Sequence, residues 1–136
     1  MKTVWITGAS SGFGAASARW FAQRGWHVGT WARRLDRLEL LRREILEAYP
    51  KASVWIDAVD VRDAAAVQSA WDRRPFADVD VLVNNAGLAL GKESVEEGLL
   101  EDWDEMIDTN LKGLLYATRA IAPTMVARGS GHIINV

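Results

Sequence analysis

Residues 7–14 run Thr7-Gly8-Ala9-Ser10-Ser11-Gly12-Phe13-Gly14, directly after an apolar segment at 3–7 (TVWIT) and directly before a small-residue segment, Ala15-Ala16-Ser17-Ala18. This order predicts a strand, a glycine-rich turn and a helix. Glycine lets the backbone adopt positive φ and lets a ligand come close to main-chain N–H groups. The first turn of the helix adds unpaired N–H donors and a partial positive charge. The segment therefore predicts a turn that binds phosphate.

Two other interpretations of this turn compete with phosphate binding by a dinucleotide. A plain strand-to-helix turn with a serine cap uses the same residue types, and a lone glycine pattern does not separate the two. A nucleoside-triphosphatase loop needs Gly-Lys-Ser or Gly-Lys-Thr, which does not follow here. The spacing G-x-x-x-G-x-G also differs from the common fingerprint G-x-G-x-x-G. The place of the turn, between a strand and a helix whose small residues allow close packing on a sheet, favours the dinucleotide.

The rest of the chain alternates short apolar runs with longer segments of helical spacing, which is typical of an α/β protein with a parallel sheet. Strands are expected at 3–7, 27–31, 53–58, 79–84 and 132–136, and helices near 12–24, 35–48, 63–74 and 100–128. Gly25 and Gly129 are placed where a left-handed cap would end the first and last helices. Right-handed crossovers then predict one domain, residues 1–136, with a doubly wound, Rossmann-like sheet truncated after its fifth strand.

The expected last helix, 100–128, carries more detailed predictions. Asp102 followed by Glu105 resembles a capping box near its start. Its inward face should include Trp103, Met106, Ile107, Leu111, Leu114 and Thr118. Elsewhere, tryptophan stands where the pattern predicts aliphatic or smaller residues, at Trp5, Trp20, Trp31, Trp55 and Trp71. Overpacking is the expected cost of these large side chains.

Composition and charge argue against several classes of protein. The formal net charge of -2 gives no basic excess for nucleic acid or for an anionic membrane surface. The chain has no cysteine, which removes disulfide and thiol chemistry and the best metal ligand. No apolar stretch approaches membrane-spanning length, and no signal-peptide pattern precedes the first strand. We therefore expect a cytoplasmic globular protein that binds no nucleic acid, membrane or metal; His27 and His132, at strand starts, are assigned no chemistry.

Four segments carry a resemblance to a known family. Residues 7–14 resemble the T-G-x-x-x-G-x-G motif of the short-chain dehydrogenase/reductase family, and residues 84–87 (NNAG) resemble its N-N-A-G motif after the fourth strand. Asp60-Val61 is similar to the family's D-V after the third strand. Asn110 is similar to its active-site asparagine on the long helix. The resemblance covers the whole chain, as far as residues 133–136 (IINV).

This resemblance implies hydride transfer between a nicotinamide cofactor and a small-molecule carbonyl or alcohol substrate. It implies cofactor contacts at Gly8, Ser10, Ser11, Gly12, Phe13, Gly14, Asp60, Val61, Asn84, Ala86 and Gly87, with Asp60 at the adenine. Asn110 would orient a catalytic lysine through a bound water. A homo-oligomer is expected through the helix 100–128.

Each of these side chains also has a purely structural interpretation. Asn84 would serve equally well in a strand-ending turn, because asparagine bonds its own backbone. Asp60 could cap a helix or stand in solvent, and the neighbouring Asp57 and Asp63 raise the question of a metal cluster, which lacks other ligands. Asn110 lies among apolar residues, where an unpaired amide would cost about 1–3 kcal/mol, so it must have partners. Those partners would fasten the helix to the sheet even without catalysis.

The end of the second strand, Trp31-Ala32-Arg33-Arg34, favours NADP over NAD. At this place an acidic residue would bond the 2′-hydroxyl of NAD, whereas arginine accepts the 2′-phosphate of NADP. Arg33 falls on the position that NADP-preferring members of the resembled family use, with Arg34 beside it. The alternative is that both guanidiniums are simply solvated.

The resembled family also uses a serine just after the fifth strand and a Tyr-x-x-x-Lys pair, and neither occurs within these 136 residues. Two hypotheses follow. The first is an NADP-dependent oxidoreductase of which this chain is a fragment, inactive by itself because it has no proton donor at the substrate. The second is a non-catalytic NADP-binding or structural half-domain. Residues 11–14, 84–91 and 106–113 further resemble the branch that oxidises 3-hydroxy acids such as serine.

Overall fold

The computed structural model describes residues 1–136 without a gap and contains a single parallel sheet. Its strands are β1 (Thr3–Thr7), β2 (His27–Ala32), β3 (Ser53–Ala58), β4 (Val81–Asn84) and β5 (His132–Asn135). They lie in the order β3-β2-β1-β4-β5, and each neighbouring pair is parallel. The chain thus adds β2 and β3 on one side of β1 and then crosses back to add β4 and β5 on the other side. The strand order therefore reverses between β1 and β4. The predicted doubly wound sheet is confirmed, and this reversal is the place where such sheets bind ligands.

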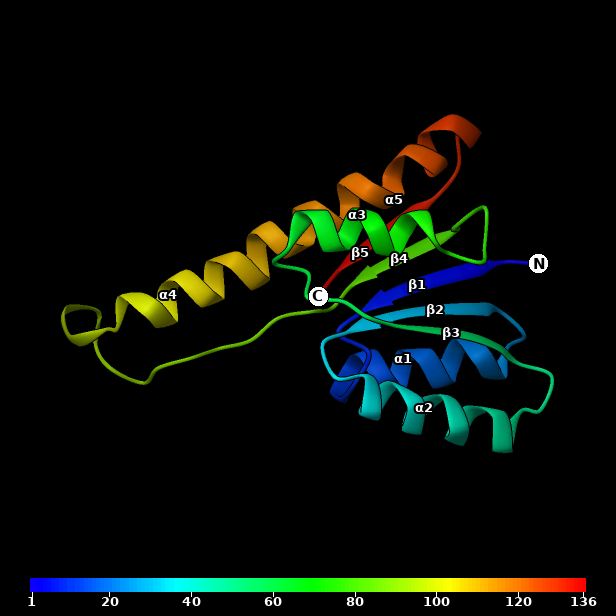
Figure 1. Ribbon diagram of the computed structural model, residues 1–136, viewed down its shortest axis with the longest axis horizontal. Helices are drawn as coiled ribbons and strands as arrows, with labels where there is room; N and C mark the ends of the chain where they lie inside the picture. The colour runs from blue at the N-terminus through cyan, green and yellow to red at the C-terminus, as the bar shows by residue number, and fades with distance from the viewer.

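Helices cover both faces of the sheet (Figure 1). The helices α1 (Gly12–Gln23) and α2 (Leu35–Ala48) lie on one face, and α3 (Ala64–Asp72) and α5 (Leu114–Arg128) lie on the other. Gly25 and Gly129 adopt φ of 76° and 67°, so the expected left-handed positions after α1 and α5 are confirmed. No helix is long and apolar enough to cross a membrane.

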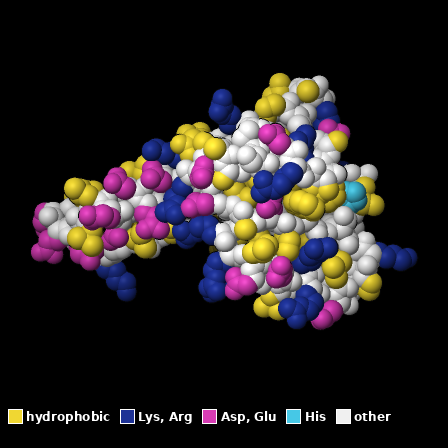
Figure 2. All heavy atoms as spheres, viewed as in Figure 1, with side chains coloured by type: hydrophobic (Ala, Val, Ile, Leu, Met, Phe, Trp, Pro, Cys, Tyr) yellow, Lys and Arg dark blue, Asp and Glu magenta, His cyan; other side chains and the backbone are white.

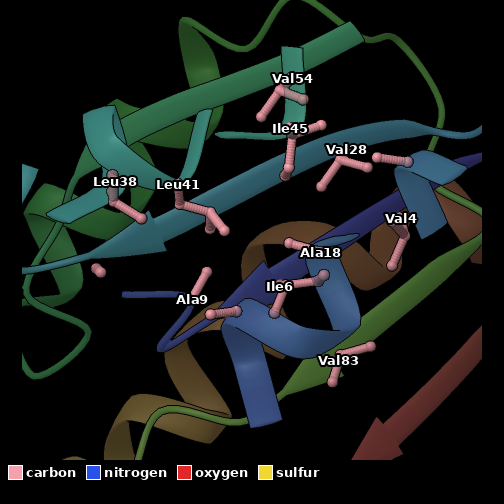
Figure 3. Close-up of a cluster of buried hydrophobic side chains, with 13 residues drawn as sticks. Val4, Ile6, Ala9, Ala18, Val28, Leu38, Leu41, Ile45, Val54 and Val83 are labelled. Carbon is pink, nitrogen blue, oxygen red and sulfur yellow. The ribbon is translucent and has the colours of Figure 1, made fainter. Parts of the chain in front are cut away.

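The core beneath α1 and α2 is built mostly from aliphatic and small side chains (Figure 3). Val4, Ile6 and Val28 of the sheet face Leu41 and Ile45 of α2 in this cluster. The buried residues of α1 are all small: Gly14, Ala15, Ala18 and Ala22. A helix with such a face can approach the sheet closely, so the N-terminus of α1 is held directly against the end of β1.

The core on the opposite face is aromatic. Trp5 is fully buried and meets Trp31 and Trp71 edge to face, with ring centroids 5.3 Å and 5.4 Å away. Trp5 also lies over its cross-strand neighbour Gly29, where an added Cβ would stand 2.2 Å from the indole. The strand thus accommodates the large ring by having no side chain beside it. The indole N–H groups of Trp5, Trp31 and Trp55 are buried without a hydrogen-bond partner, which offsets part of the gain from burial.

The expected single helix at 100–128 is interrupted. It consists of α4 (Leu100–Ile107), a π-helical segment η2 (Asp108–Gly113) and α5, and a short 3₁₀ turn η1 (Val95–Glu97) precedes it. The predicted capping box is wrong: the helix begins at Leu100, and no side chain caps it. Asp102 lies in the first turn instead.

The predicted inward face of this helix is also wrong. Of its members, Trp103, Ile107 and Leu111 are exposed, and none is fully buried. The residues that are buried are mostly small, namely Thr109, Gly113, Ala117, Ala120, Ile121 and Met125. Close packing explains the difference, since a Cβ on Gly113 would stand 2.6 Å from Val61. In addition, α4 projects beyond the sheet, and none of its residues is fully buried (Figure 1).

Candidate cofactor site

A cavity of about 410 Å³ lies at the carboxyl ends of the strands, at the reversal between β1 and β4. It is lined by Gly8, Ser10, Ser11, Gly12, Phe13, Trp31, Ala32, Arg33, Arg34, Arg37, Val59, Asp60, Val61, Asn85, Ala86, Gly87, Leu88 and Thr109. Its volume is within the range of small-molecule sites. A larger groove of about 570 Å³ lies at the opposite end of the sheet, around Trp26 and Tyr49, but it does not touch the glycine turn. The smaller cavity therefore holds the candidate site.

The glycine turn has the conformation that the sequence predicts. Gly8 and Gly12 have φ of 65° and 55°, in the left-handed region that other residues rarely adopt. Gly8 also passes so close to the next strand end that a Cβ would stand 2.8 Å from Ala86 Cα. Gly14, in the first turn of α1, lies against the glycine turn itself, where a Cβ would collide with the Gly8 carbonyl oxygen. The turn is thus folded back on β4 with the first turn of α1 facing the cavity.

Hydrogen bonds fasten this turn to the N-N-A-G segment. The Thr7 hydroxyl accepts from the N–H groups of Asn85 and Ala86, at 3.1 Å and 3.0 Å. In return, Asn85 Nδ2 donates to the Gly8 carbonyl oxygen at 3.1 Å. Segments some 78 residues apart in the chain are therefore locked into one rim of the cavity. Because the donors are fixed before any ligand arrives, a bound phosphate would meet a preformed turn.

Three arginines follow the end of β2 and line the cavity: Arg33, Arg34 and Arg37. Arg34 is paired with Asp36, at 2.9 Å between Nη2 and Oδ2. Arg33 forms no ion pair and no side-chain hydrogen bond within the chain, and it is exposed. Ala32, the residue before it, offers no carboxylate. This corner of the cavity therefore presents an unpaired guanidinium to a ligand.

Asp60 is the one carboxylate that lines the cavity, and it is engaged by its neighbour Arg62. Arg62 donates from Nε to Asp60 Oδ1 at 3.0 Å and from Nη2 to Oδ2 at 2.8 Å. These side-chain hydrogen bonds hold the pKa of Asp60 below its usual value. Asp57 pairs with Arg73 instead, and Asp63 caps α3 by accepting from the Ala66 N–H, so the three aspartates do not converge on one point.

Asn110 lies in the π-helical segment and bonds the backbone of Leu88 twice. Its Oδ1 accepts from the Leu88 N–H at 2.9 Å, and its Nδ2 donates to the Leu88 carbonyl oxygen at 2.8 Å. The predicted partners are therefore present, although the residue is exposed and the prediction of an apolar surrounding is wrong. A wide π turn at a functional side chain is common, because it turns that side chain away from the regular helical register.

Comparison with known proteins assigns this fold and this turn to a family. A model of the short chain dehydrogenase family matches residues 2–136. The chain belongs to the short-chain dehydrogenase family. The expected resemblance of this short-chain dehydrogenase to the 3-hydroxy acid branch is confirmed as well. The NADP-dependent 3-hydroxy acid dehydrogenase YdfG of Salmonella typhi is 47% identical over 135 residues, which make up 98% of this chain and 52% of that protein.

Two further proteins extend this comparison. Sulfoacetaldehyde reductase 2 of Chromohalobacter salexigens is 46% identical over 136 residues, or 98% of this chain and 53% of that protein. A solved structure described as the closed form of serine dehydrogenase complexed with NADP+ superposes with a TM-score of 0.91 at 45% identity, covering 98% of this chain and 52% of that chain. This short-chain dehydrogenase thus spans about half the length of the curated relatives it matches.

Most of the side chains that the sequence singles out meet at the cavity of this short-chain dehydrogenase. Two do not line it. Gly14 lies behind the turn, and Asn84 is buried on the far side, where its Nδ2 donates to Thr118 Oγ1 and to Asn135 Oδ1, both at 3.0 Å. The side chain of Asn84 therefore joins β4, β5 and α5, and it does not make the turn bond to its own backbone that the structural interpretation expected.

The sequence interpretation also missed several lining residues of the short-chain dehydrogenase: Trp31, Ala32, Arg37, Val59, Asn85, Leu88 and Thr109. A signal existed for Arg37, which lies four residues after Arg33 and so, on a helix start, comes back to the same side. Asn85 stands inside a motif that was already identified. No pattern in the chain marks Val59, which follows β3, or Thr109, which lies in η2.

Proposed function

We propose that this chain is the NADP(H)-binding part of an oxidoreductase that transfers hydride between NADP(H) and a carbonyl or alcohol. The observation that carries the proposal is the unpaired Arg33 guanidinium at the rim of the cavity, with Ala32 where a carboxylate would be needed to select NAD. The NADP dependence named for the 3-hydroxy acid dehydrogenase relative supports it.

The lining residues fit such a dinucleotide, each by its own chemistry. The N–H groups of the turn Gly8–Gly14 suit the pyrophosphate, and the guanidinium of Arg33, aided by Arg34 and Arg37, suits the 2′-phosphate. Asp60 and Val61 would hold the adenine, and Ala86 and Gly87 would border the nicotinamide half. When bound, the cofactor supplies or accepts the hydride.

Asn110 belongs to the same proposal as a positioning residue. Its amide makes two hydrogen bonds to the Leu88 backbone, which fixes the segment after the N-N-A-G motif to the long helix. We propose that it orients a lysine through water in the whole protein. The proton donor at the substrate would be the tyrosine of a Tyr-x-x-x-Lys pair, which these 136 residues do not contain.

The alternative is a non-catalytic NADP-binding or structural half-domain. One check separates the two: whether the source reading frame continues after Val136 into a serine and a Tyr-x-x-x-Lys. For the whole enzyme we propose a 3-hydroxy acid as the substrate, on the strength of the 47% identity to the Salmonella relative.

Arg33→Ala should weaken NADP+ binding by roughly tenfold or more while sparing NAD+, because it removes a charge-assisted contact to the 2′-phosphate. The measurement is equilibrium titration of the chain by tryptophan fluorescence. Arg42→Ala is the matched control, since it removes the same charge from α2 outside the cavity. Equal loss for both cofactors, or no loss for NADP+, would contradict the assignment of Arg33.

The long helix should also join two copies of the chain. Leu100, Ile107, Leu111 and Leu115 are 48–67% exposed on α4, η2 and α5. Figure 2 shows hydrophobic side chains on this projecting arm, with acidic side chains between them. We expect a dimer in light scattering at tens of micromolar, a concentration suited to weak association. Replacing Leu111 and Leu115 by lysine should give a monomer, whereas Leu40→Lys on α2 should not. A monomeric unmutated chain would overturn this part of the proposal.

A further inference from the structure

Arg62 does not line the cavity, but it forms an ion pair with Asp60, the carboxylate that does. Its side chain is about one third exposed and is not among the lining residues. Four hydrogen bonds join it to Asp60: the Arg62 backbone N–H and Nε both donate to Oδ1 at 3.0 Å, Nε also donates to Oδ2 at 3.2 Å, and Nη2 donates to Oδ2 at 2.8 Å. Both carboxylate oxygens therefore accept hydrogen bonds from Arg62.

Arg62 is itself held from a second direction. Its Nη1 lies 3.5 Å from Glu105 Oε1 on α4, so the guanidinium bridges the segment after β3 and the long helix. The negative charges of Asp60 and Glu105 both favour the charged guanidinium and raise the pKa of Arg62. The bridge fixes the orientation of the Asp60 carboxylate without any contribution from the cavity.

Arg33 is the group that depends on this arrangement. It lines the same cavity as Asp60, and it has no partner in the chain. Its positive charge also contributes to the low pKa of Asp60, so the two groups are close enough to interact. An Asp60 carboxylate that was not neutralised would attract the Arg33 guanidinium and would repel a phosphate beside it. Either effect would weaken the binding of a 2′-phosphate and would leave the binding of a 2′-hydroxyl unchanged.

We propose that Arg62 is a specificity-determining positioning residue: by neutralising Asp60, it leaves Arg33 free for the 2′-phosphate of NADP. The inference rests on the NADP site proposed above and adds a residue that does not contact the cofactor.

Arg62→Gln tests this inference, because glutamine keeps a hydrogen-bond donor and removes the charge. NADP+ binding should weaken by about fivefold and NAD+ binding should stay constant, the size expected for one partly exposed ion pair. Adding Asp60→Asn to Arg62→Gln should restore the ratio of the two affinities, and Arg62→Lys should largely preserve it. Arg73→Gln is the control, since it breaks the 2.8 Å pair with Asp57 outside the cavity.

A second readout needs no cofactor. In the free chain the Arg33 Nε–H resonance should shift in Arg62→Gln, as Arg33 pairs with Asp60, and should return in the double variant. An unchanged affinity ratio and an unmoved Arg33 resonance in Arg62→Gln would overturn the role of Arg62. An equal loss of affinity for NADP+ and NAD+ would also overturn it, because Arg62 would then only stabilise the fold. A failed NADP+ preference in the unmutated chain would instead count against the proposed NADP site, and the resonance would still decide on Arg62.

Discussion

The 136-residue chain by itself is expected to bind NADPH and to leave carbonyl substrates unreduced. Loss of a general acid alone typically lowers a rate by about 10²–10⁴-fold, and the chain contains no Tyr-x-x-x-Lys to supply one. Asn110 cannot compensate, because its amide is bonded to the Leu88 backbone and has no lysine to position. NADPH oxidation, followed by absorbance with serine-derived and simple carbonyl substrates, should stay at the level of a control without protein.

Two controls make this result interpretable. The 3-hydroxy acid dehydrogenase relative, assayed in parallel, should turn over and so validate the substrates. Asn110→Ala should leave the background rate unchanged. If the chain reduced any carbonyl well above the control, our assignment of the proton donor would be wrong, and Tyr116 and Ser94 would be the first residues to replace.

Trp5→Ala is expected to lower the free energy of unfolding by about 3 kcal/mol, the largest stability effect in the chain. Removing a buried indole leaves a cavity, for which costs of about 3–5 kcal/mol are typical. The value falls at the lower end because the indole N–H is already buried without a partner. Urea denaturation followed by circular dichroism measures the change.

Gly29 supplies the internal control for this prediction. Gly29→Val alone should destabilise the fold by about 1–3 kcal/mol, since its Cβ would collide with the Trp5 ring. In the Trp5→Ala background the same substitution should be stabilising, because valine refills part of the space and suits a strand. A Gly29→Val effect of the same sign and size in both backgrounds would show that the two residues do not interact as described.

The elements whose signals are local could be predicted from the sequence. The glycine turn, the five apolar runs that form strands and the left-handed positions at Gly25 and Gly129 each depend on a few neighbouring residues, and the structure has them. The capping box and the inward face of the last helix failed because they depend on where the helix lies. Its close contact with Val61 requires small residues on the inside, and its projection beyond the sheet leaves Trp103 and Leu111 outside.

The same distinction holds for the candidate site. Arg33 could be singled out as a candidate because it directly follows a strand, and the residues that distinguish NADP from NAD are expected at that place. The role of Arg62 could not, since its bridge to Glu105 joins positions 43 residues apart. Asn84 was expected at the cofactor from its motif, but its amide is used between β4, β5 and α5. A motif therefore locates a site, while packing decides which of its side chains face the ligand.

We propose that this cavity selects NADP through the Arg33 guanidinium at the end of β2. Isothermal titration of the unmutated chain with NADP+ and with NAD+, under identical salt and pH, tests it most directly. We expect one site per chain and an affinity for NADP+ that is roughly tenfold or more above that for NAD+. Equal affinities, or tighter binding of NAD+, would contradict it.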